Sequence, residues 1–90
     1  MPRNKLYYIL RNVVEMLAQH DYEEANKLMT KEAVAYEGDK KVYPEIRNIL
    51  YDLAFLHKDF LEVGKIDPTL KNKTHLVITD IKAFYNTFVN

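Results

Sequence analysis

The apolar residues in the first part of the chain recur at helical spacing. When residues 5–19 are placed at steps of about 100°, large apolar side chains gather on one face and charged or amide side chains on the other. A strand would alternate the two groups, so the pattern predicts a helix over residues 5–19. The apolar face consists of Leu6, Ile9, Leu10, Val13, Val14, Met16 and Leu17.

A second helix is predicted over residues 22–37. Asp21, followed three residues later by Glu24, is typical of a capping box at a helix start, and Gly38 suits a left-handed helix end. Because only a few residues separate this helix from the first, we expect the two to pack as an antiparallel hairpin. The apolar stripe is narrow and consists of Tyr22, Ala25, Met29, Ala33 and Tyr36.

A third helix is predicted over residues 44–63. Pro44 suits the first helical position, where its missing N–H costs nothing, and Gly64 suits the end. The apolar face covers about half of the circumference, so we expect this helix to contact more than one neighbour. The face consists of Ile46, Ile49, Leu50, Leu53, Ala54, Leu56, Phe60 and Leu61.

A fourth helix is predicted over residues 68–88, starting at the cap-and-proline pair Asp67-Pro68. The segment 74–79 is rich in β-branched residues and would also suit a short strand, which is the alternative. A narrow apolar arc supports the helix, and it consists of Leu70, Val77, Ile81, Phe84 and Phe88.

The four segments predict an all-α protein, a compact four-helix bundle built from two antiparallel helical hairpins. Ninety residues form one domain, residues 1–90, and only two glycines and three prolines occur, which favours a few long elements. Lysine plus arginine and aspartate plus glutamate are equal at 13 each, so the basic excess typical of nucleic-acid binders is absent. Nucleic acid is therefore an unlikely partner on charge alone.

Several catalytic and binding chemistries are disfavoured by composition. The chain has no Cys and no Ser, which removes the two commonest nucleophiles and any thiolate metal site. Two isolated glycines cannot build a phosphate-binding loop, and no His follows a Glu at the spacing that di-iron bundles use. We therefore expect no enzyme activity, metal or cofactor. The lack of cysteine fits a cytoplasmic protein, and no apolar run is long enough for a membrane span.

Two aromatic residues lie where the third helix is expected to be polar. Tyr51 and Phe55 are one turn apart, and Arg47 and Lys58 lie on the same side. Paired aromatics are favoured anchors in protein interfaces, whereas single exposed ones are common and carry no meaning. We predict that these four residues belong to a partner or self-association surface, which Tyr8 on the polar side of the first helix would extend.

His57 lies in the middle of the apolar face of the third helix. The ordinary interpretation is a core or boundary histidine with one ring nitrogen hydrogen-bonded. The alternative is a pH-sensitive switch or a pocket residue, and its proton partner would then have to come from another helix.

The sequence favours a non-enzymatic protein–protein interaction module, a small accessory, regulatory or immunity-type factor that docks a helical surface on a protein partner. A homodimer is compatible with the same surface. One alternative is a nucleic-acid-binding transcriptional regulator. Another is a small-ligand binder or enzyme with an interhelical pocket around His57, Tyr22 or Tyr36.

Overall fold

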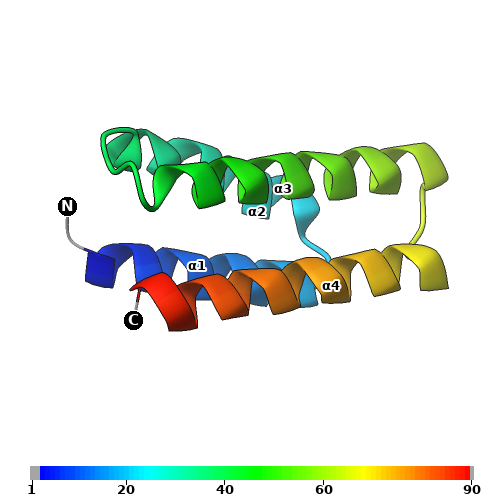
Figure 1. Ribbon diagram of the computed structural model, residues 1–90. Coiled ribbons are helices and arrows are strands. Elements are labelled where there is room, and N and C mark those ends of the chain that lie inside the picture. Colours follow the sequence, from blue (N-terminus) through cyan, green and yellow to red (C-terminus); the bar gives the residue numbers. More distant parts are fainter. Residues whose placement is uncertain (1–2, 90) are drawn as a thin grey trace.

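The computed structural model describes residues 3–89, which form an all-α four-helix bundle with no strand in that range (Figure 1). The α-helices are α1 (Arg3–Ala18), α2 (Tyr22–Ala33), α3 (Tyr43–Val63) and α4 (Pro68–Phe84). A 3₁₀ turn, η1 (Val34–Tyr36), continues α2, and a π-helical turn, η2 (Tyr85–Val89), continues α4. The predicted fold class is confirmed.

The helices are arranged as a closed ring. Helices α2 and α3 lie in one layer and α1 and α4 in the other (Figure 1), and each helix packs against its two neighbours in the order α1, α2, α3, α4. The bundle measures 38 × 21 × 17 Å. Tyr7 and Tyr85 join the first helix to the last turn, with their ring centroids 5.0 Å apart in an edge-to-face contact.

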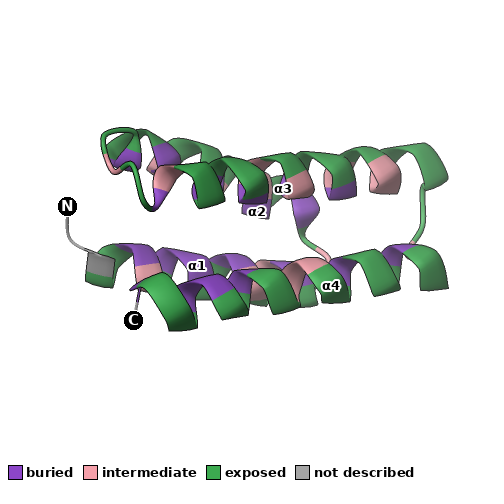
Figure 2. Cartoon of the chain, in the orientation of Figure 1, coloured by how far each residue is buried: buried purple, intermediate pink, exposed green. Residues whose placement is uncertain are grey.

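Apolar side chains from all four helices meet in one core. The buried positions lie on the inner faces of the helices, and exposed positions cover the outer faces (Figure 2). The first helix contributes the face that the periodicity predicts, and Leu6, Leu10, Val13 and Leu17 are fully buried. The core therefore follows the helical period of the sequence over most of its length. No helix within residues 3–89 has the length and apolarity that a membrane crossing requires.

Two predicted helix starts are confirmed by hydrogen bonds, and one predicted helix end is confirmed by its backbone conformation. The Asp21 carboxylate accepts from the Glu24 N–H at 3.4 Å, and the Asp67 carboxylate accepts from the Leu70 N–H at 2.8 Å. Gly64 ends α3 in the left-handed region, at φ 75°. The two carboxylates satisfy backbone N–H groups that a helix start leaves without an intrahelical partner.

The turn between α1 and α2 is a Schellman motif centred on His20. The Asp21 N–H donates to the Met16 carbonyl at 2.8 Å and the His20 N–H to the Leu17 carbonyl at 3.0 Å. His20 has a φ of 60°, the only positive value at a non-glycine residue in the described chain. Histidine is among the residues that tolerate this region best after glycine.

The predicted role of Gly38 as a left-handed helix end is wrong. Helix α2 ends at Ala33, tightens into η1, and Gly38 does not adopt a positive φ. Asp39 organises this turn instead, because its carboxylate accepts from the backbone N–H groups of Lys41 and Val42 at 3.1 and 3.2 Å. An Asx turn thus replaces the expected glycine cap.

The end of α4 departs from the predicted arc at Phe88. In η2 the helix widens to a π-turn. Because a π-turn brings residues five apart onto the same side, Val89 and not Phe88 follows Phe84 on the inner face. Val89 is consequently buried and Phe88 is exposed, with its ring still packed against Phe84 at 5.8 Å between centroids.

The predicted apolar face of α3 is too wide. Ala54 and Leu61 are exposed although both were expected to face the core. Tyr22, the first residue of α2, packs against Phe60, so α3 continues past the end of its antiparallel neighbour (Figure 1). Leu61 follows Phe60 and is exposed on this part of α3.

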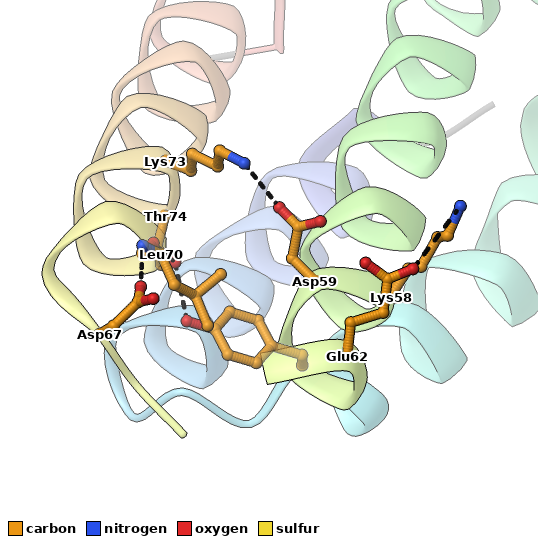
Figure 3. Close-up of polar contacts among 8 residues, drawn as sticks. Lys58, Asp59, Glu62, Asp67, Leu70, Lys73 and Thr74 are labelled. Atoms are coloured by element: carbon orange, nitrogen blue, oxygen red, sulfur yellow. Dashed lines mark hydrogen bonds and ion pairs between the residues drawn. The ribbon is translucent and has the colours of Figure 1, made fainter. Parts of the chain in front are cut away.

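A buried hydrogen-bond chain fixes α4 against the α1–α2 turn, and segment 74–79 is helical. The Thr74 hydroxyl donates to the Leu70 carbonyl at 2.7 Å, so its oxygen accepts from the Tyr22 hydroxyl, also at 2.7 Å (Figure 3). The Tyr22 oxygen is then left to accept from Nδ1–H of His20 at 3.0 Å. Within the described residues no buried side-chain nitrogen or oxygen lacks a hydrogen-bond partner, as buried polar groups require.

Candidate functional site

The aromatic pair predicted from the sequence lies on the outer face of α3. Tyr51 and Phe55 are 58% and 65% exposed, on the side of the helix opposite its buried residues. Arg47 donates a hydrogen bond to the Tyr51 hydroxyl at 3.5 Å, one turn along the helix. We call this face the α3 row, and it consists of Arg47, Tyr51, Ala54, Phe55, Lys58 and Glu62.

The middle of the α3 row is hollowed. A shallow apolar depression of about 250 Å³ is lined by Tyr51, Ala54, Phe55 and Lys58. These residues have the spacing i, i+3, i+4 and i+7, which forms the hole that receives one side chain of a facing helix in a coiled coil. The small Ala54 provides the depth, and the two aromatic rings form part of the rim.

Beside the α3 row runs a groove between α3 and α4. Its wider part, about 560 Å³, has Ile49 and Phe84 among its lining, and its second part, about 510 Å³, has Leu56 and Val77. Phe55 and Leu76 line the second part from opposite helices and are 65% and 63% exposed. Large apolar side chains so exposed on both walls of a groove are typical of interaction surfaces.

Two carboxylates occupy the middle of this groove. Asp52 of α3 and Asp80 of α4 line both of its parts. Partial burial raises the pKa of Asp52, and the nearby negative charge of Asp80 raises it further. Within the described residues neither carboxylate forms an ion pair, so the groove presents uncompensated negative charge between two apolar regions.

The far end of the groove is closed by a different carboxylate. Lys73 of α4 donates to Asp59 of α3 at 2.8 Å, and this ion pair raises the pKa of Lys73 (Figure 3). On the row itself, Lys58 and Glu62 form a longer ion pair of 4.0 Å along the helix. Lys73 is thus already paired, and it does not neutralise the two aspartates further along.

The other predicted site residues do not join the α3 row. Tyr8 is exposed on α1, which packs against α2 and α4 and lies across the bundle from α3. His57 is half-buried between α3 and α2, in a hollow that Glu23 and Lys27 also line. Tyr22 and Tyr36, named with it for an interhelical pocket, are instead buried in the core.

The fold and this face together define a small helical bundle with an exposed surface of mixed apolar and acidic character. Comparisons of the chain with protein-family models, curated proteins and solved structures give no match. Across residues 3–89, no three His, Asp or Glu side chains are grouped as a metal ion would require.

The aromatic pair is predictable from the sequence, but the groove beside it is not. Asp52 and Asp80 are unremarkable charged residues in the sequence, and Leu76 lies outside the apolar arc of its helix. The one available signal was Leu76 itself, a large apolar residue on a polar face, as Phe55 is. Nothing in the periodicity of either helix indicates that the two residues face one groove.

Proposed function

We propose that this protein is a non-enzymatic protein–protein interaction module that docks a partner on the α3 row and the adjoining α3–α4 groove. The observation that carries the proposal is the pair Phe55 and Leu76, two strongly exposed apolar side chains from different helices on one groove. Covering a side chain of this kind contributes about 1.5–3 kcal/mol. An accessory, regulatory or immunity-type role in the cytoplasm is part of the proposal.

The charge of the face supports a protein partner over nucleic acid. Glu45, Asp52 and Asp80 line the groove, and a phosphate backbone would be repelled by them. A matching partner carries apolar side chains flanking a lysine or arginine, because two unpaired carboxylates are costly to cover without a cation.

The test is capture of partners by tagged protein from an extract of the source organism. We expect Phe55→Lys and Leu76→Lys each to abolish capture of the same protein, because each places a charge in the covered apolar region. Val34→Lys is the matched control, since Val34 is as exposed as Phe55, at 65%, but lies on η1. A set of captured proteins that is identical for the wild type and all three variants would refute the proposed face.

A further inference from the structure

We infer that the α3 row binds the α3 row of a second copy of this chain, in antiparallel orientation. This inference rests on the proposed function, because it names an occupant for the same face. The surface has two features that an occupant must match: the hollow at Ala54, which a side chain would fill, and the unpaired carboxylate of Asp52, which a cation would approach.

The row meets the first requirement itself. In an antiparallel pair whose two-fold axis passes between Ala54 and Phe55, Phe55 of each copy comes level with the hollow of the other. The hollow has the four-residue spacing that accepts one such side chain, and Ala54 leaves room for the ring. The contact is isologous, so two identical insertions form at once and the assembly closes as a dimer.

The same alignment brings opposite charges together. Arg47 lies as many residues before the axis as Glu62 lies after it, so Arg47 of one copy is level with Glu62 of the other. Lys58 is likewise level with Tyr51 of the other copy, one residue from Asp52. The pairing therefore places the Lys58 cation beside the Tyr51 ring and near the unpaired carboxylate of Asp52, and it places Arg47 beside Glu62.

A parallel pairing lacks this complementarity. It would set Arg47 beside Arg47, Lys58 beside Lys58 and Glu62 beside Glu62, so each charged residue of the row would face a like charge. The order of charges along the α3 row, with Arg47 first and Glu62 last, thus favours the antiparallel dimer. Glu62 is available for such a contact, because its side chain is exposed and its ion pair to Lys58 within the same chain is long, at 4.0 Å.

Sedimentation velocity across a range of protein concentrations tests the dimer. We expect the wild type to dimerise and Phe55→Lys to raise the dimer Kd by about a hundredfold, because each interface holds the ring twice. Val34→Lys should leave the Kd unchanged. A wild type that stays monomeric to roughly millimolar concentration, or a dimer that is indifferent to Phe55→Lys, overturns the inference.

Charge reversal tests the orientation. Arg47→Glu and Glu62→Arg should each raise the dimer Kd by about tenfold, and the double variant should return it to within about threefold of the wild type. A double variant that dimerises no better than the single ones overturns the antiparallel pairing. Circular dichroism establishes that each variant is folded. If the wild type is monomeric while Phe55 and Leu76 still govern capture of another protein, the second copy is the wrong occupant and the proposed function stands.

Discussion

The hydroxyl of Thr74 links two helices through hydrogen bonds. It donates to its own helix at Leu70 and accepts from Tyr22 of α2, and both side chains are almost fully buried. Replacement by valine keeps the shape of the side chain but removes the acceptor, which leaves the tyrosine hydroxyl with only His20. The loss of stability caused by this replacement should therefore exceed the loss caused by the same replacement at an exposed threonine.

We expect Thr74→Val to lower the free energy of unfolding by about 1–2 kcal/mol. Thr79→Val is the matched control, because Thr79 makes the same hydrogen bond to the carbonyl one turn back, at 3.0 Å, but on the exposed side of α4. That change should stay within about 0.5 kcal/mol. Urea denaturation measures both, and equal effects would show that the link to Tyr22 contributes nothing.

Asp52 is a second residue of interest, because its surroundings disfavour the ionised form of its carboxyl group. Burial raises its pKa, and Asp80 across the groove raises it again. A carboxyl whose pKa is higher in the folded than in the unfolded state binds its proton more tightly when folded. Its ionised form therefore lowers stability above the folded pKa, and the penalty disappears as the pH falls below the unfolded value.

We expect Asp52→Asn to raise the free energy of unfolding at neutral pH by up to about 0.5 kcal/mol, a small value because the group is only partly buried. The gain should vanish at about pH 3, where the aspartate is protonated in both states. Urea denaturation of the wild type and the variant at the two pH values measures this difference. The other charged residues that line the groove are Glu45, Asp59, Lys73 and Asp80. A variant less stable than the wild type at neutral pH would contradict the assignment.

At the scale of the helices, substitution of the two glycines distinguishes the effect of backbone conformation from the effect of side-chain packing. A Cβ would meet nothing within 4 Å at either Gly38 or Gly64, but only Gly64 has a positive φ, of 75°. We expect Gly64→Ala to lower the free energy of unfolding by about 1 kcal/mol through backbone strain alone. Gly38→Ala, the control, should be neutral or stabilising by up to about 1 kcal/mol. Thermal unfolding of both variants compares them, and equal losses would contradict a conformational origin.

Helix starts were predictable because they depend on local chemistry. Asp21 and Asp67 cap the backbone a few residues away, so no distant part of the chain is needed to identify them. The wrong predictions concern residues whose burial depends on distant parts of the chain. Leu61 is exposed on the part of α3 that continues past the first residue of α2, and Phe88 is exposed in the last turn, which widens while Val89 and Tyr85 pack inward.

The same distinction explains what could be predicted of the site. The exposure of Tyr51 and Phe55 follows from the helical period of α3 alone. The groove needs a second helix at a particular rotation, and the pairing of Asp52 with Asp80 joins residues on different helices. Periodicity fixes which face of one helix is covered, but not which residues of two helices become neighbours.

At the scale of the whole molecule, one face carries both proposals. The dimer would cover Phe55, which a foreign partner of the groove also needs, so the two forms of binding would exclude each other. Leu76 distinguishes them, because it lies on α4 and outside the α3 row. A foreign partner should depend on both residues, whereas the dimer depends chiefly on Phe55.

The ring order of the helices has a consequence for how the chain acquires its structure. Three of the four packed helix pairs join neighbours in the sequence, and only α1 with α4 and η2 joins distant segments. Most of the core is therefore assembled across short loops, which cost little closure entropy and are typical of rapid folding. The encounter of Tyr7 with Tyr85 bears the largest entropic penalty, and it would be among the last events on the folding pathway.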